Sequence, residues 1–212
     1  MELCGGRMSA LPSIKGAVFS LAVEEVSKLV SAGGISRDEL ARRLQPGDLE
    51  ILAEPVQVTQ WYDIRIYARF VELLRDVEGG GSDDYLRRRG ARSAERLIHA
   101  GVYQQLEYLN RLQVAKTQDP KERFLAFGRD LRLLTTLSAS VYNFMRWESS
   151  PDPELPGRHR IEVSEAGPLP TLFDPHIEGF INRMTVQGGE PDLWQARRVR
   201  PGLLVFSMTR PL

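Results

Sequence analysis

The sequence predicts an α+β protein in which a helical first two thirds packs on an antiparallel sheet of about four strands. Two observations support this fold class. Apolar residues recur at three- and four-residue steps up to about residue 139, which is typical of helices with one buried face. From about residue 140 they alternate, and β-branched and aromatic residues become frequent, which is typical of strands. One further helix is embedded among these strands near the C-terminus.

The first two helices are predicted from their apolar faces and their ends. Residues 14–32 form the first helix, which a Gly-Gly pair ends. The second begins at Ser36, because Ser36 and Glu39 have the spacing of a capping box, and Pro46 stops it. Residues 49–58 are expected to form a short turn and an extended piece. The buried face of the first helix contains Val18, Ala22, Val26, Leu29 and Val30.

A Trp-Tyr pair, Trp61 and Tyr62, lies in the first turn of the next predicted helix, which takes Thr59 as its N-cap. The apolar stripe of this helix runs from Tyr67 to Val77 and is expected to supply the layer that covers the sheet. A Gly-rich loop at 78–84 follows, capped by a Ser or Asp. A helix is then predicted over 84–116, interrupted at a glycine, with inward Leu97, Leu106, Leu109 and Leu112.

The remaining elements are predicted from turn residues and alternation. Asp119-Pro120 opens a helix, since Pro is favoured at the first helical position. Strands follow at 140–148 and 158–163. Asp174 caps a helix that ends at Gly188, and a hairpin around a Pro-Gly turn closes the chain. The late helix is expected to bury Ile177, Phe180, Ile181 and Met184.

The composition is that of an ordinary globular chain. Among its 212 residues 28 are basic and 28 acidic, a balance that argues against nucleic acid or an anionic membrane as the main partner. The single cysteine, Cys4, permits no intramolecular disulfide, which fits a cytoplasmic location. No apolar stretch approaches the ~20 residues that span a bilayer, and Arg greatly outnumbers Lys, which suggests a bacterial source. We expect a disordered leader at 1–12 and a single domain at 13–212.

No sequence motif assigns a reaction. The three histidines, His99, His159 and His176, have no second ligand-type residue at a metal-binding spacing. The chain has no Gly-x-Ser-x-Gly elbow, and its Gly-Gly-Gly-Ser run lacks the Lys and the preceding strand of a phosphate loop. Two arginine clusters, at 87–96 and 197–200, would form an anion site if they converged and are otherwise solvated surface.

Three stretches carry a resemblance to a known family: "WYDIRIYARFVELLRDVEGGG", "RRRGARSAERLIHAGVYQQL" and "GFINRMTVQGGEPD". Their order is similar to that of a myxobacterial paralogous family with no assigned activity, over most of residues 14–209. The matching features are the Trp-Tyr pair, a helix with Arg89, Gly90 and Arg92, and a late helix with Gly179. The element order also looks like that of 4-vinyl reductase and haem nitric-oxide sensor domains, which enclose small ligands. The resemblance implies a binding or sensory module and leaves the cofactor unassigned.

We therefore expect a non-enzymatic bacterial module that binds a small apolar ligand or a protein partner in a signalling or regulatory role, in a groove between helices and sheet. One alternative is an enzyme with a dispersed active site around His99 or His159. Another is a structural dimerisation domain that uses the hairpin edge to form a homodimer. DNA binding is disfavoured because the neutral chain lacks a basic footprint. The candidate binding residues are Trp61, Tyr62, Arg89, Arg92 and His99, of which the first two have core anchoring as their alternative role.

Overall fold

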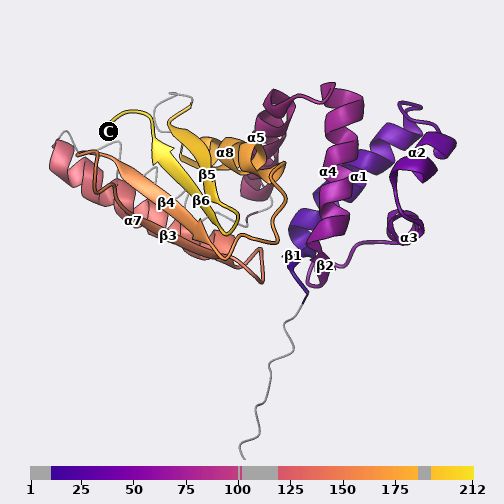
Figure 1. The fold of residues 1–212 in the computed structure, drawn as a ribbon, viewed down its shortest axis with the longest axis horizontal. Helices are drawn as coiled ribbons and strands as arrows, with labels where there is room; N and C mark the ends of the chain where they lie inside the picture. Colours follow the sequence, from indigo (N-terminus) through magenta and orange to yellow (C-terminus); the bar gives the residue numbers. More distant parts are fainter. Residues whose placement is uncertain (1–10, 100, 102–118, 186–191) are drawn as a thin grey trace, which may run out of the picture.

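The computed structural model describes residues 11–99, 101, 119–185 and 192–212, and its helices and antiparallel strands confirm the predicted α+β class (Figure 1). The expected leader lies outside these residues except for its last two. The described helices are α1 (Gly16–Ser31), α2 (Arg37–Arg43), α3 (Pro46–Ala53), α4 (Ile64–Gly79), α5 (Asp83–His99), α7 (Pro120–Ala139) and α8 (Phe173–Thr185). Helices α1 to α4 lie at one end of the molecule and α7 at the other, with α5 and α8 between them (Figure 1).

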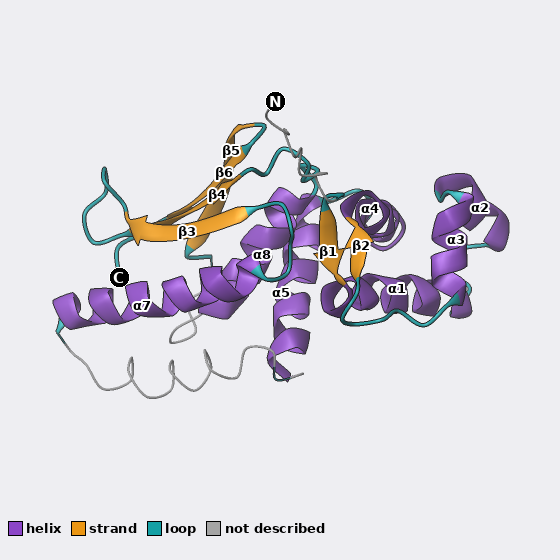
Figure 2. Ribbon diagram, turned by 90° about the horizontal axis from the view of Figure 1, so that it is seen from below, coloured by secondary structure: helices purple, strands orange, loops and turns teal. Residues whose placement is uncertain are grey.

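The strands form two antiparallel sheets, a small one of order β1-β2 and a larger one of order β3-β4-β6-β5. Helices α7 and α8 lie on the same side of the larger sheet (Figure 2). The residues of the two central strands that face these helices, Ile161, Val163, Leu204 and Phe206, are fully buried. The strands are β1 (Ser13–Lys15), β2 (Trp61–Asp63), β3 (Arg146–Pro151), β4 (His159–Ser164), β5 (Trp194–Arg200) and β6 (Leu203–Met208).

The prediction that Trp61 and Tyr62 lie in the first turn of a helix is wrong. They belong to β2, in which Tyr62 pairs with Ile14 and Trp61 with Lys15 of β1. Helix α4 begins after them, because the Asp63 carboxylate accepts a hydrogen bond from the Arg65 amide at 2.8 Å and so takes the N-cap role expected of Thr59. A pairing partner almost fifty residues earlier in the chain overrides the local helix signal.

The apolar stripe of α4 is buried as predicted, but its partner differs from the expected one. Tyr67, Phe70 and Leu74 are fully buried. Helix α4 packs against α1 and α5, whereas α7 and α8 cover the sheet. The apolar layer that covers the sheet therefore comes from α7 and α8, which are close to the strands in the sequence.

The region after α2 departs from the expected turn and extended piece, since residues 46–53 form α3. Ser36 caps α2 as predicted, with its hydroxyl accepting from the Glu39 amide at 3.1 Å. Pro46 follows the end of α2 and is the first residue of α3. A helix tolerates Pro there because the N–H of its first residue has no partner within the helix. The Asp48 carboxylate accepts from the Gln45 amide at 2.9 Å and fixes this new start.

The second half of the chain follows the predicted order, with shifts at element ends. Asp119 caps α7 by accepting from the Lys121 amide at 2.9 Å, and β5 and β6 pair as the expected hairpin. Helix α8 begins one residue before Asp174, whose carboxylate is bound by Arg198 of β5 instead of capping the helix. Of the helix predicted over 84–116, the structure describes only the part that forms α5. The leucines predicted after it, at 106, 109 and 112, lie outside the described residues, as does Gly188, the predicted end of the late helix.

The strand predicted at 140–148 begins only at Arg146, because the preceding residues pair with the N-terminal strand. Tyr142 forms a bridge with Ile14, and the Lys15 amide donates to the Val141 carbonyl at 2.8 Å. The Ser13 amide donates to the Asn143 side chain at 2.7 Å. These contacts tie the start of the described chain to the connection between α7 and the larger sheet.

Helices α5 and α8 cross with their backbones in contact, and two glycines make the approach possible. A Cβ atom at Gly90 would lie 1.9 Å from the His176 carbonyl oxygen, and one at Gly179 would lie 2.0 Å from the Arg87 carbonyl oxygen. Neither backbone oxygen can move without shifting its helix. The crossing holds the helical end of the molecule against the sheet end (Figure 1).

We expect Gly90→Ala to lower the free energy of unfolding by about 3 kcal/mol, because the added methyl group overpacks a contact between two backbones. The measurement is the urea midpoint followed by circular dichroism. Gly47→Ala is the matched control: Gly47 lies in α3 with open space around its Cβ position, so this change should raise stability by up to about 1 kcal/mol. Equal effects of the two substitutions would contradict the prediction.

Candidate functional site

A small cavity lies where α1, α5, α7 and α8 meet β3 and the turn after α7. Its volume is about 30 Å³, and since a water needs about 10–15 Å³ of such space, it has room for about two non-hydrogen atoms. We call it the interhelical cavity. The residues that line it are Val18, Ser93, Leu97, Ser138, Val141, Tyr142, Trp147, His176, Ile177 and Phe180.

Helical spacing brings the polar residues of the cavity to one place. Ser93 and Leu97 are one turn apart on α5, and His176 and Phe180 are one turn apart on α8, so each pair shares a helix face. Because the His176 carbonyl rests over Gly90, the first turn of α8 lies beside Arg89 and its neighbours on α5. The backbone crossing thus positions His176 between the cavity and a buried arginine.

Arg89 is fully buried and held by groups from three other helices. Its Nε donates to Glu25 of α1 at 2.8 Å, and its Nη1 donates to His176 Nε2 at 2.9 Å and more weakly to the Tyr67 hydroxyl at 3.4 Å. The other oxygen of Glu25 lies 3.0 Å from Arg96. A buried cation requires such partners, since an unpaired charge in the interior is very costly.

These contacts determine which nitrogen of His176 carries the proton. A guanidinium group only donates hydrogen bonds, so His176 Nε2 must accept from Arg89. Burial lowers the pKa of His176 well below its usual value, and the nearby charges of Arg89 and Arg92 lower it further. The ring is therefore neutral, with its proton on Nδ1. No protein group among the described residues accepts a hydrogen bond from this Nδ1–H.

Trp147 of β3 brings a second buried donor to the same cavity. Its indole ring stacks against Phe206 of β6, with centroids 6.4 Å apart and nearly parallel planes. Its Nε1–H is buried and likewise lacks an acceptor among the described residues. Buried N–H groups without a partner are rare in folded proteins and cost about 1–3 kcal/mol each. The cavity therefore combines mostly apolar walls with two N–H donors.

The structure does not bring the five candidate residues from the sequence together. Trp61 is exposed, with the Lys15 ammonium 4.5 Å above its ring. Tyr62 is a core anchor: its ring stacks on Phe19 at 4.3 Å, and its hydroxyl accepts from the Gln57 amide at 2.9 Å. Neither residue lines the interhelical cavity.

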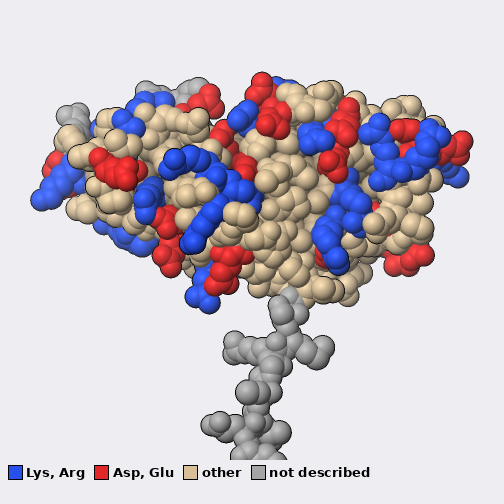
Figure 3. Space-filling view, in the orientation of Figure 1, with Lys and Arg blue, Asp and Glu red and all other residues tan. Residues whose placement is uncertain are grey.

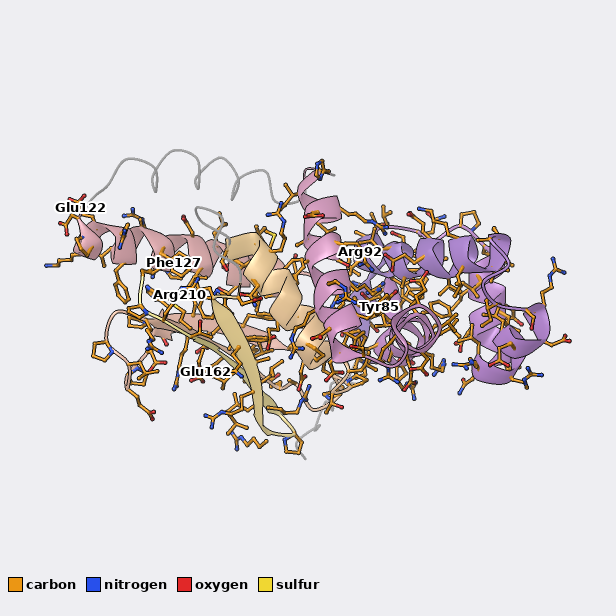
Figure 4. The ribbon with its side chains drawn as sticks, turned by 90° about the horizontal axis from the view of Figure 1, so that it is seen from above. Tyr85, Arg92, Glu122, Phe127, Glu162 and Arg210 are labelled. Atoms are coloured by element: carbon orange, nitrogen blue, oxygen red, sulfur yellow. The ribbon has the colours of Figure 1, made fainter. Side chains whose placement is uncertain are left out.

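The remaining candidates all lie on α5 but face different surroundings. The Arg92 guanidinium lies 5.6 Å from the centroid of the Tyr85 ring (Figure 4). His99 is exposed at the helix end, where its Nδ1 donates to the Glu95 carbonyl at 2.7 Å. Only Arg89 adjoins the cavity, through its hydrogen bond to His176.

His159, the other histidine considered for catalysis, is buried between α7 and the sheet. Its Nε2 donates to the Phe124 carbonyl at 3.1 Å, and its ring stacks on that of Phe124 at 4.0 Å. Phe127, which lies between α7 and the sheet in Figure 4, packs on its other side. Burial lowers the pKa of His159. No carboxylate of the described chain hydrogen-bonds to His159 or His99, so neither has the arrangement of an oriented general base.

Each arginine cluster contributes one side chain that pairs with an acidic residue of α8. Arg87 of α5 donates to Glu178 at 2.6 Å, and the Arg198 guanidinium is bound by Asp174. The second oxygen of Glu178 accepts from the Ala196 amide of β5 at 2.7 Å. Basic and acidic side chains are accordingly interspersed on the face shown in Figure 3.

His176 and Trp147 are the cavity residues that sequence reasoning missed. From the sequence, His176 is one of three histidines without a second ligand-type residue, and Trp147 is part of a predicted strand. The available signal was the pair of helices that each contain an internal glycine, Gly90 next to Arg89 and Gly179 three residues after His176. Glycines at such positions permit a close crossing, and a polar residue beside one is then buried.

Comparison of the chain with profiles of protein families, with curated proteins and with solved structures found no match. None of the described helices combines the length and apolar character needed to cross a membrane. The described residues also contain no group of three or more His, Cys, Asp or Glu side chains placed to hold a metal ion. Only the structure of this chain therefore indicates what the interhelical cavity can bind.

We expect Arg89→Met to lower the free energy of unfolding by about 3–5 kcal/mol, because it leaves Glu25 partly buried without its closest cation. Chemical denaturation measures the change. Arg88→Met is the control, since Arg88 is exposed on the same helix and its loss should alter stability by less than about 0.5 kcal/mol. A small effect at both positions would refute a structural role for the buried arginine.

The stability of the protein should fall in mild acid because of His176. The unfolded chain protonates this ring near its ordinary value of 6.5, while the folded-state pKa is far lower, so stability is full above pH 6.5 and decreases below it. Between pH 7.5 and 5.5 the wild type should lose about 1.4 kcal/mol more than His176→Asn. Unfolding curves at both pH values test this, and the contribution of His159 cancels because both proteins contain it. Parallel losses would contradict the assignment.

Proposed function

We propose that this protein is a non-enzymatic bacterial module that binds an apolar ligand carrying an oxygen-bearing end, in a sensory or regulatory role in the cytoplasm. The observation that carries the proposal is the interhelical cavity, whose mostly apolar lining includes two residues, His176 and Trp147, that each hold a buried N–H donor without a partner among the described residues. Apolar walls with a few convergent polar groups are typical of small-molecule sites. The cellular setting and the regulatory role rest on the sequence, through its single cysteine and through an element order that looks like that of domains that enclose small ligands.

The size of the cavity limits what it accepts. A volume of about 30 Å³ fits the end of a ligand and not a whole drug-sized molecule, which needs about 300 Å³ or more. Val141, Trp147 and Phe180 are only half-buried, unlike the other residues that line the cavity. We assign the apolar remainder of the ligand to this side, where these three residues supply contact area.

The state of His176 supports binding over catalysis. A general base needs a free nitrogen within reach of the proton that it removes. The basic nitrogen of His176, Nε2, is already occupied by the Arg89 guanidinium. Its other nitrogen carries a proton and can only donate, as can the Trp147 indole. Such a pair fixes the orientation of a ligand and removes no proton from it.

The test combines native mass spectrometry with titration of the purified full chain. Mass spectrometry reports a co-purified ligand and the oligomeric state together. In titrations with hexan-2-one, we expect one of the three tryptophan indole N–H signals to shift in nuclear magnetic resonance spectra, and Trp147→Phe should remove that signal. A bare chain whose indole signals do not respond would refute ligand binding, and a dimer without ligand would favour the dimerisation alternative.

Cavity-filling variants show whether the probe occupies this site. Ser138→Leu places a larger side chain in the interhelical cavity and should weaken hexan-2-one binding at least about tenfold, because it removes the space for the ligand end. Thr136→Leu is the matched control, since Thr136 is exposed on the same helix and should leave affinity unchanged. Equal affinities for the two variants would place the probe elsewhere.

A further inference from the structure

We propose that the interhelical cavity selects a neutral carbonyl oxygen, as in a ketone, an ester or an amide, and that Arg89 sets this selectivity by fixing the tautomer of His176. This inference rests on the proposed function, since it names the chemical class of the ligand end. Its basis is that His176 and Trp147, which line the cavity, each hold a buried N–H group without a partner among the described residues, and that the structure gives neither group a means of becoming an acceptor.

The donor character of the cavity follows from the contacts of its two rings. The indole N–H of Trp147 donates and never accepts. His176 can present either nitrogen in principle, but Nε2 receives the Arg89 N–H at 2.9 Å. A ligand atom that meets Trp147 and His176 must therefore accept hydrogen bonds. A carbonyl oxygen has two lone pairs and only accepts, so its chemistry matches that of the two N–H donors.

Arg89 cannot release His176 by rotating away. Its guanidinium is fully buried, with Nε bound by Glu25 at 2.8 Å and Nη1, the nitrogen that donates to His176, also 3.4 Å from the Tyr67 hydroxyl. Arginine stays protonated at every pH at which the protein is folded. The Nδ1–H tautomer of His176 is thus a permanent feature of the folded chain, and Arg89 acts as a positioning residue behind the site.

Charge distinguishes a carbonyl from a carboxylate. The one carboxylate of Glu25 is shared by Arg89 and Arg96, so the cations near the cavity are only partly neutralised, but none of them lines the cavity. Arg96 is 37 % exposed, and Arg92 lies over the Tyr85 ring. None of the cavity-lining residues is a Lys or Arg. A carboxylate there would be buried among apolar walls without a contacting cation, which is far more costly than burying a neutral carbonyl.

The closing experiment compares four probes of matched carbon chain on the full-length protein: hexan-2-one, 2-methylhex-1-ene, hexanoate and hexylammonium. Calorimetry gives the affinities, and the Trp147 indole signal reports whether a probe reaches the site. We expect hexan-2-one to bind about tenfold more tightly than each of the others, since it alone satisfies both donors without bringing a charge. Tightest binding by hexanoate would overturn the inference and indicate an anion site.

The set of probes that bind distinguishes a failure of carbonyl selectivity from a failure of the proposed ligand-binding function. Equal affinity for all four probes would uphold an apolar ligand site and overturn carbonyl selectivity. No response to any probe, as expected if the cavity holds only water, would refute the proposed function itself. Trp147→Phe should reduce the preference for the ketone over the alkene about three- to tenfold by removing one donor. An unchanged preference in this variant would also overturn the inference.

Variants at His176 test the tautomer. His176→Asn keeps an N–H donor near the position of Nδ1–H and should retain the ketone preference, whereas His176→Leu should lose it. Since His176→Leu also leaves Arg89 with one partner fewer, ¹⁵N spectra of the wild-type ring provide a measurement that needs no variant. They should show a protonated Nδ1 and a bare Nε2. The opposite tautomer would overturn the role assigned to Arg89.

Discussion

The close crossing of α5 and α8 is the constraint on which the rest of the structure depends. Helices normally pack with their axes 8–10 Å apart because side chains separate them. Here Gly90 and Gly179 remove that separation, and each lies against a carbonyl of the opposite helix. The crossing joins the helical end to the sheet end, and it leaves so little space that the neighbouring Arg89 is fully buried. Fold and candidate site therefore have one origin.

The polar groups around the crossing form a series with a defined direction. Glu25 binds Arg89, Arg89 donates to His176, and His176, which lines the cavity, holds one N–H without a partner among the described residues. Each member fixes the hydrogen-bonding role of the next, because a guanidinium only donates and a neutral imidazole donates from one nitrogen only. A buried salt bridge such as that between Glu25 and Arg89 contributes little net stability. Through the hydrogen bond from Arg89 it nevertheless determines which nitrogen of His176 can donate, although neither Glu25 nor Arg89 lines the cavity.

Sequence patterns predicted those parts of the fold that depend on neighbouring residues. The capping of α2 by Ser36, the Pro-entered α7 and the C-terminal hairpin follow from short-range rules, and the structure confirms them. The strand at Trp61 and the late start of β3 depend on pairing with residues far along the chain, which no local rule registers. The residues that line the interhelical cavity could not be found from the sequence for the same reason: they come together only through the crossing and the burial that it produces.

The N-terminal strand β1 has a consequence for the order in which the chain can fold. Its residues complete their hydrogen bonds only with Val141 and Asn143, about 130 positions later in the chain. Contacts of such high sequence separation require a large loss of chain entropy before they form, and they slow folding. During synthesis α1 and α4 can associate early, but the edge of β1 stays unpaired until α7 has left the ribosome. The first described residues of the chain are thus among the last to reach their final structure.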